Sequence, residues 1–283
     1  MKVVELPPFM TGFGVQQYHR AEDGIVRAAE EGCTHWYIDG ASFADRAAAW
    51  NKLRFENMRS LIDRYNVKPI YHGSFKIPLS SDVPELRDIS VQYVLREVDV
   101  AAELSAPLIV HGGGIVEPRE VSQAKERALE GLIASIRTIA NYAEDKGVPI
   151  WLENLSNYMK FHPFYYIYTH MPEYERVLSE VDNIWMLLDV CHDSVGGGDP
   201  TETFVKFNKR VAAFSFSDTE GGRDSHLPLG LGRIDFKRLV KHILALDWKG
   251  VVAFETRDIN VTKNVEYLNR LVLDLNTPTA DIA

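Results

Sequence analysis

The 283-residue chain is short of cysteine and of positive charge. Its two cysteines, Cys33 and Cys191, are too few for a disulfide framework and predict reduced thiols in a cytoplasmic protein. Lysine and arginine total 31 against 40 aspartates and glutamates, which gives a formal net charge of −9. A protein that neutralises nucleic-acid phosphates normally has the opposite balance, so we expect no nucleic-acid partner.

Long apolar runs and nucleotide-binding motifs are also missing. No stretch approaches the ~20 apolar residues of a membrane-spanning helix, and residues 1–10 lack the apolar run of a signal peptide. No Gly-x-Gly-x-x-Gly follows the first expected strand, and the glycine runs at 111–114 and 195–198 lack the Gly-Lys-Ser/Thr ending of a phosphate loop. No linker rich in proline, glycine or serine divides the chain, so we expect one domain over residues 1–283, with no membrane contact.

Two kinds of segment alternate along the chain. Short, continuously apolar runs are typical of parallel strands that are covered on both faces. They lie at 35–39, 68–72, 107–111, 149–154, 184–189, 211–218 and 250–255, with a weaker run at 3–10 that Pro7 and Pro8 interrupt. Longer segments with apolar residues three and four positions apart predict helices with one buried stripe. They include 21–32, 85–104, 124–147, 236–246 and 264–275, and Asp199-Pro200 has the form of another helix start.

This alternation predicts the fold class. Eight strand–helix units in 283 residues leave about 35 residues for each unit. Repeated βα units form a parallel sheet with right-handed crossovers. At this length, eight units favour an α/β fold that is a single (β/α)8 TIM barrel over an open doubly wound sheet.

Ionisable side chains recur where the expected strands end. In such barrels the active site is built at the C-terminal ends of the strands. One residue of this kind is more often a cap or a loop hydrogen bond, but six successive strands carry one at the same offset. Carboxylates that end apolar strands are desolvated and repel one another, so they need a compensating cation. Imidazole with carboxylate favours Zn, Mn, Co or Fe(II) over Ca. Asp218, which ends the seventh expected strand, is a potential ligand or acid–base group. We predict a divalent-metal centre that uses His72, His111, Glu153, Asp189, His192, Asp224, His226 and Glu255.

Other features have competing interpretations. Residues 157–174 are dense in aromatic side chains. One interpretation is functional: these side chains line a pocket, close over it or form a subunit contact. The other is local packing within a long loop. Cys191 lies beside the expected centre, but the acids and histidines explain the site without a thiol nucleophile. The remaining histidines lack strand-end positions and are expected to be structural or on the surface: His19, His35, His162, His170 and His242.

The order of the motifs resembles a known superfamily. The motifs are HGS at 72–74, HGGG at 111–114, ENLSN at 153–157, DVCH at 189–192, D-x-HLPLGLGRIDF at 224–236 and FET at 254–256. They are similar to those of the xylose isomerase-like barrels over residues 20 to 275. That superfamily includes sugar-phosphate isomerases and epimerases, ketose 3-epimerases, inosose dehydratases and isomerases, and the endonuclease IV family of abasic-site nucleases.

The resemblance to the nucleases implies up to three metal sites. By motif position, the first would use His72, His111 and Glu153; the second would use Glu153, Asp189 and Glu255; the third would use His192, Asp224 and His226. Both the nucleases and the epimerases carry a further histidine on the seventh strand, where this chain has Ser215. The second site thus lacks one ligand, which leaves His226 or a water to replace it.

The resemblance to the isomerases and epimerases implies the function that we favour. In those members two glutamates bind one metal and also move protons, so Glu153 and Glu255 are the expected catalytic residues. The expected cofactor is one to three ions of Mn, Zn, Co or Mg, and the expected partner is a small carbohydrate. A homo-oligomer is left open.

The alternatives are an abasic-site nuclease and an inosose-type dehydratase. The HGSF run at 72–75 favours the nuclease, whereas Ser215, the negative net charge and the scattered basic residues Lys160, Arg223 and Arg233 argue against it.

Overall fold

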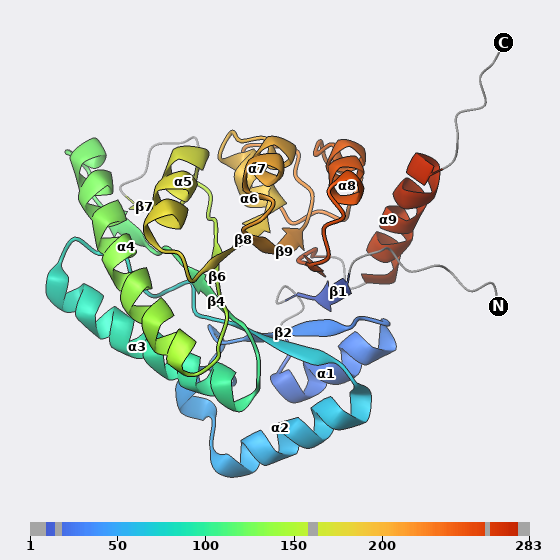
Figure 1. Cartoon of the computed structure of the whole chain (residues 1–283), viewed down its shortest axis with the longest axis horizontal. Coiled ribbons are helices and arrows are strands. Elements are labelled where there is room, and N and C mark those ends of the chain that lie inside the picture. The colour runs from blue at the N-terminus through green and yellow to red at the C-terminus, as the bar shows by residue number, and fades with distance from the viewer. Residues whose placement is uncertain (1–9, 15–18, 158–163, 258–260, 277–283) are drawn as a thin grey trace.

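The computed structural model describes residues 10–14, 19–157, 164–257 and 261–276. Within these ranges, eight parallel strands close into a barrel (Figure 1). The strands, in the order in which neighbours pair, are β1 (Met10–Phe13), β2 (His35–Asp39), β3 (Lys68–His72), β4 (Leu108–His111), β6 (Ile150–Glu153), β8 (Trp185–Asp189), β9 (Val211–Phe216) and β10 (Val251–Phe254), which pairs with β1. The predicted α/β fold, a (β/α)8 barrel, is confirmed.

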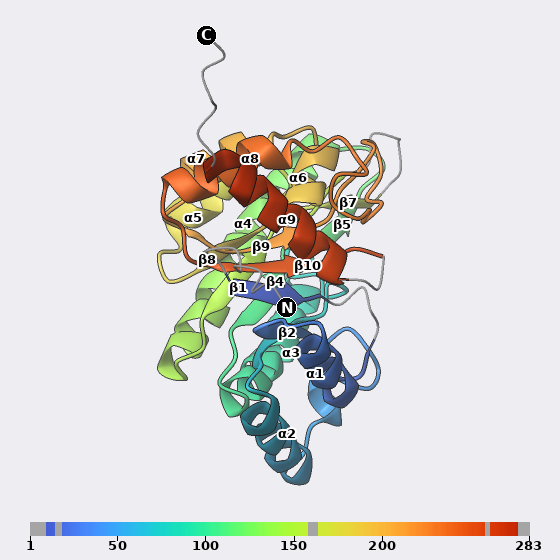
Figure 2. The ribbon, with the colours of Figure 1, turned by 90° about the vertical axis from the view of Figure 1, so that its right-hand side faces the viewer.

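Helices surround the barrel. They are α1 (Ala21–Glu30), the 3-10 turn η2 (Ala47–Ala49), α2 (Lys52–Tyr65), α3 (Pro84–Glu103), α4 (Val121–Asp145), α5 (Met171–Glu180), α6 (Val190–Val195), α7 (Pro200–Phe207), α8 (Phe236–Ala245) and α9 (Val261–Asn276). Figure 2 shows α8 and α9 side by side on the outside of the barrel. Asp199 caps α7 as its sequence predicts, because its carboxylate accepts hydrogen bonds from the backbone N–H groups of Thr201 and Glu202.

Some boundaries differ from the prediction. The first barrel strand continues past residue 10 to Phe13, and residues 3–9 lie outside the described residues. Strand β9 ends at Phe216 rather than at residue 218. Helix α2 was not among the predicted segments because Met58 is its single fully buried side chain, so its apolar stripe is narrow. A short antiparallel pair outside the barrel, β5 (Gly114–Val116) and β7 (Phe164–Tyr166), was also not predicted.

The apolar core lies in two layers. The larger layer lies between the strands and the surrounding helices and includes Trp36, Phe214 and Phe254. The smaller layer fills the barrel interior. In the described part of the chain, no helix has the length and apolarity needed to cross a lipid bilayer.

Candidate active site

The barrel interior determines where the predicted site residues lie. Side chains alternate along a strand, so a residue two positions beyond an inward-facing one also faces inward. The interior apolar layer includes Ile70, Ile109, Trp151, Leu187, Ala213 and Ala253. The residues two positions later are His72, His111, Glu153, Asp189, Ser215 and Glu255, and all of them are buried. The sequence thus produces a polar layer directly beyond the apolar one, at the C-terminal end of the barrel.

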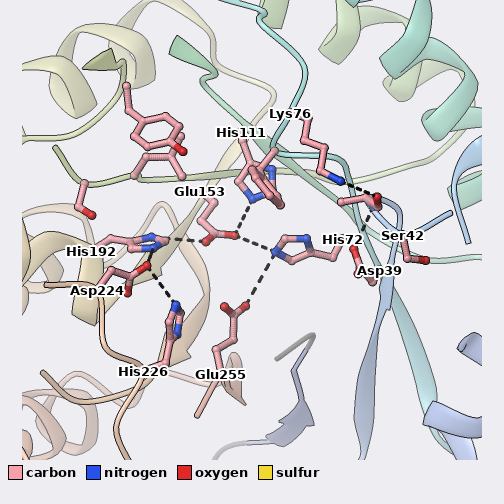
Figure 3. Close-up of a pocket in the computed structure, with 15 residues that line it drawn as sticks. Asp39, Ser42, His72, Lys76, His111, Glu153, His192, Asp224, His226 and Glu255 are labelled. Carbon is pink, nitrogen blue, oxygen red and sulfur yellow. Dashed lines mark hydrogen bonds and ion pairs between the residues drawn. The ribbon is translucent and has the colours of Figure 1, made fainter. Parts of the chain in front are cut away.

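A cavity of about 480 Å³ lies at this end (Figure 3). Asp189 is completely buried, and its Oδ2 atom is 3.7 Å from His192 Nδ1. The other predicted ligand residues line the cavity: His72, His111, Glu153, His192, Asp224, His226 and Glu255. The structure therefore brings together all the residues predicted as ligands, and their chemical roles stay predictions.

The first group of side chains surrounds Glu153. Its Oε2 atom is 3.4 Å from His72 Nε2 and 3.3 Å from His111 Nε2. Burial alone would raise the pKa of Glu153, but the two imidazoles outweigh it and hold this pKa well below its usual range. Burial also lowers the pKa of His72, yet the adjacent Glu153 and Glu255 raise it to about 9. His72, His111 and Glu153 are close enough to share one metal ion.

The second group surrounds Asp224. Its Oδ2 atom is 3.2 Å from His192 Nε2 and 3.1 Å from His226 Nε2. These contacts overcome the effect of burial and lower the pKa of Asp224. The Asn154 carbonyl orients the ring of His192, because His192 Nδ1 lies 2.9 Å from the carbonyl oxygen. A carbonyl oxygen can only accept a hydrogen bond, so Nδ1 is the protonated nitrogen. His192, Asp224 and His226 could hold a second ion, and Glu153, Asp189 and His192 form a third group between the two.

Glu255 stands apart from these groups. In the described residues it belongs to none of the three sets that could share an ion. Its Oε1 atom lies 3.9 Å from His72 Nε2. Burial, reinforced by the charge of Glu153, raises the pKa of Glu255 to about 7. The predicted set of Glu153, Asp189 and Glu255 stays a prediction; in the described residues Glu153 and Asp189 also form a group with His192, and His226 Nε2 lies 3.1 Å from Asp224 Oδ2.

Unpaired polar atoms show whether a cation fits. Among the described residues of the site, four buried atoms form no hydrogen bond: His72 Nδ1, His111 Nδ1, Asp189 Oδ2 and Glu153 Oε2, the last of which has only the ion-pair contacts with the two imidazoles. Leaving buried carboxylate oxygens unpaired is costly, and a divalent cation beside them removes that cost. Imidazole and carboxylate donors within 4.8 Å of one another match the ligands of Zn, Mn, Co or Fe(II). The residues present therefore fit a divalent metal.

Asp218 has a different role from the one predicted. It lies two residues beyond the end of β9, and its carboxylate accepts hydrogen bonds from the backbone N–H groups of Thr219, Gly230, Gly232 and Ile234 at 2.8–3.1 Å. These bonds hold together the loop that carries Asp224 and His226. The strand-end position indicated a potential ligand or acid–base group, whereas the structure shows that the loop backbone uses both carboxylate oxygens of Asp218.

The cavity also contains residues that the sequence reasoning missed. Asp39 ends β2 and lines the cavity, so the strand-end rule applied to the second strand would have found it. Lys76 follows the HGS motif and is exposed at the same cavity, where its Nζ donates to the carbonyl of Ala41. In Figure 3, Asp39, Ser42 and Lys76 lie on the opposite side of the cavity from His192 and Asp224.

The features with competing interpretations are partly resolved. In the aromatic stretch, Tyr166 lines the cavity, whereas Tyr168 and Tyr174 are buried against each other with ring centroids 4.8 Å apart. Residues 158–163, which include His162, lie outside the described residues. Cys191 Sγ is 3.3 Å from Asp224 Oδ1, and burial together with the nearby carboxylates raises the pKa of this thiol to about 12. It is therefore a protonated thiol and a poor nucleophile.

Comparisons with known proteins agree with the barrel fold. The model of a protein family described as xylose isomerase-like TIM barrel matches residues 25–271. The uncharacterized protein MJ1614 of Methanocaldococcus jannaschii is 28% identical over 218 residues, which cover 76% of each chain. The crystal structure of a D-tagatose 3-epimerase-like protein superposes with a TM-score of 0.81 at 22% identity and covers 95% of this chain and 98% of the other.

A second solved structure has the same fold. It is a D-allulose 3-epimerase from Methylomonas sp., with a TM-score of 0.77 at 17% identity, and it covers 94% of this chain and 99% of the other. At these identities the two structures support the barrel fold.

Proposed function

The chain belongs to the xylose isomerase-like TIM barrel family, and from that premise we propose that it is a divalent-metal-dependent isomerase or epimerase of a keto sugar or related polyol. The observation that carries the proposal is the pair of buried glutamates facing one cavity. Glu153 lies among imidazoles that could hold a metal with it, while Glu255 lies outside every such group. A proton-transfer reaction beside a carbonyl uses such a combination of a Lewis acid and acid–base groups.

The metal would be held by residues of the two imidazole groups. His72, His111 and Glu153 would hold one ion, and His192, Asp224 and His226 would hold a second. When bound, the ion supplies a Lewis acid that polarises a carbonyl and hydroxyl pair and acidifies the neighbouring C–H bond.

The two glutamates would perform the proton transfers. Glu255, with a pKa of about 7, can be either charged or neutral near neutral pH, so it can serve as a base or as an acid. Inverting a carbon centre requires a base that takes the proton on one face and an acid that gives a proton on the other, so Glu153 would serve on the face opposite Glu255.

One observation favours a second candidate function. The group of Glu153, Asp189 and His192 shares Glu153 with the first imidazole group and His192 with the second. Such neighbouring sites also suit a phosphodiesterase that uses several metal ions. Against a nuclease, the single Lys or Arg among the described residues lining the cavity is Lys76, and the chain carries a net charge of −9. A duplex binder needs a surface with the opposite charge.

A single panel of substrates separates these functions. The metal-loaded protein is incubated in D₂O with ketoses, sugar phosphates and inososes, and in parallel with a duplex that contains an abasic site. We expect a new sugar isomer carrying deuterium at the carbon beside the carbonyl. Loss of water from an inosose would indicate the dehydratase, and strand incision without sugar exchange would indicate the nuclease.

A further inference from the structure

A second cavity, of about 530 Å³, lies at the N-terminal end of the barrel, opposite the candidate active site. Its volume is in the range of small-molecule binding sites. Its lining follows from the same alternation of side chains, because residues two positions before the inward-facing apolar layer also face inward. Five such residues line the cavity: His35, Lys68, Pro107, Pro149 and Lys249. We call it the basal cavity.

The basal cavity carries positive charge without a balancing acid. Lys68 and Lys249 line it, and among the described residues that line it there is no aspartate or glutamate. The cavity at the other end of the barrel has the opposite character, since four carboxylate side chains line it: Asp39, Glu153, Asp224 and Glu255. In a chain with a formal net charge of −9, a cavity with two ammonium groups and no acid favours an anionic ligand.

The two lysines differ in their availability to a ligand. Lys249 Nζ is 2.6 Å from Asp247 Oδ1, so its charge is already paired. Within the described part of the chain, the ammonium group of Lys68 forms neither an ion pair nor a hydrogen bond. Lys68 is therefore the cation that can pair with the carboxylate of a ligand.

The hydrogen bonds of His35 determine which ring nitrogen carries a proton. Thr34 Oγ1 donates its single proton to the carbonyl of Thr11 at 3.0 Å, so it can only accept from His35 Nδ1, which lies 2.9 Å away. His35 is 8% exposed, and burial, reinforced by the charge of Lys68, lowers its pKa to about 4. The ring is therefore neutral, and Nε2 has a lone pair that no described residue uses. Because His35 lines the basal cavity, this atom can accept a hydrogen bond from a ligand.

The rest of the lining is largely apolar. Pro69, Pro107 and Pro149 line the cavity together with Trp151, which is 9% exposed. An indole and several proline rings form a surface against which a flat apolar ring packs well. His35 and Lys68 are paired in register on β2 and β3, so the acceptor and the cation lie on neighbouring strands.

We propose that the basal cavity is a second binding site, for a small aromatic acid. Its carboxylate pairs with Lys68, its ring packs against Trp151, and a hydroxyl or N–H group donates to His35 Nε2. We assign this site binding and not catalysis, since barrel enzymes build their active sites at the other end of the strands. The inference goes beyond the proposed function and does not depend on it.

Calorimetric titration of the metal-loaded protein with 3- and 4-hydroxybenzoate tests the site. We expect one molecule to bind per chain, and Lys68→Met to weaken binding by roughly 10-fold or more, because the carboxylate loses its charged partner. Lys76→Met is the matched control, since Lys76 lines the cavity at the other end of the barrel. It should leave the affinity unchanged. No binding of either acid up to about 10 mM would overturn the proposal. A loss in Lys76→Met equal to or larger than the loss in Lys68→Met would also overturn it.

Benzoate tests the part of His35, because it lacks the hydroxyl group. We expect the better of the two hydroxybenzoates to bind the wild type roughly 3- to 10-fold more tightly than benzoate, and this preference to vanish in His35→Phe. Wild type that shows no such preference, or a preference that persists in the folded variant, would contradict the contact with Nε2. A crystal structure of the wild-type complex provides a measurement without a variant. It should place the carboxylate within hydrogen-bond distance of Lys68 Nζ, and an acid bound only outside the basal cavity would overturn the proposal.

Discussion

The side chain of Asn154 forms two hydrogen bonds with the backbone of Asp189. Its Nδ2 donates to the Asp189 carbonyl at 3.0 Å, and its Oδ1 accepts from the Asp189 N–H at 2.8 Å. Because Asn154 directly follows Glu153, this pair of bonds fixes the end of β6 against the end of β8. The carbonyl of Asn154 also accepts the proton on His192 Nδ1. One residue thus orients three members of the candidate metal groups.

Replacing this amide should weaken metal binding. In Asn154→Asp the second oxygen cannot donate to the Asp189 carbonyl and adds a negative charge close to it. We expect the affinity for Zn or Mn to fall by about 10- to 100-fold, as for other residues that orient metal ligands. Isothermal titration of the metal-free protein measures the change.

Asn157 provides the matched control. It forms the same pair of bonds, in this case with the backbone of Tyr166: Nδ2 donates to the carbonyl at 3.0 Å, and Oδ1 accepts from the N–H at 2.7 Å. Asn157→Asp should destabilise the loop without changing metal affinity. Equal losses of affinity in the two variants would show that the effect comes from general destabilisation.

Metal binding should release protons and strengthen as the pH rises. In the metal-free protein the pKa of His72 is raised to about 9 and that of Asp189 to about 6, so protons compete with the metal for these groups. The apparent Kd should therefore decrease between about pH 6 and about pH 9. Titrations in two buffers of different ionisation enthalpy measure the number of protons released, and an affinity that does not change with pH would rule out this set of ligands.

Glu97 should make the metal-free protein less stable at alkaline pH. This glutamate of α3 is buried and accepts a hydrogen bond from the N–H of Ser74, and burial raises its pKa from 4.5 to about 8. The folded state then binds a proton that the unfolded state has lost, so the free energy of unfolding decreases as pH rises from about 4.5 to about 8. Glu97→Gln keeps the acceptor oxygen and should be more stable than the wild type by about 2–4 kcal/mol near pH 9.

Urea denaturation at about pH 4 and about pH 9 measures this difference. At the lower pH the variant and the wild type should be nearly equal, because the glutamate is largely neutral in both states. Asp88→Asn makes the same change of charge at an exposed site on the same helix and should alter stability little at either pH. A similar gain in Asp88→Asn would assign the effect to overall charge instead of to burial.

The sequence predicts the barrel well because its signal is local. Strands buried on both faces have continuous apolar runs in the sequence. The alternation of inward and outward side chains then predicts that strand-end residues such as His111 and Glu153 face the barrel interior. The short pair β5–β7 was missed because three-residue strands are too short to show a period.

The grouping of the site residues depended on information that the sequence does not contain. Asp218 and Asp224 are both acids in the loop after β9, yet the first turns toward backbone N–H groups and the second toward two imidazoles. That difference depends on loop conformation, which includes a positive φ of 46° at His226. Likewise, the bond from Ser215 to Glu255 joins residues 40 positions apart, so the sequence indicated a missing ligand but not what the hydroxyl does there.

Deuterium exchange measures whether Glu255 moves a proton on a carbon beside a carbonyl. The metal-loaded wild type and the Glu255→Gln variant, matched in metal content, are incubated with a keto sugar in D₂O, and deuterium in the recovered sugar is followed by NMR. We expect deuterium at the carbon beside the carbonyl with the wild type, and a rate lower by roughly 10²–10⁴ with the variant. Equal rates of deuterium incorporation by the two proteins at equal metal content would show that Glu255 does not transfer this proton.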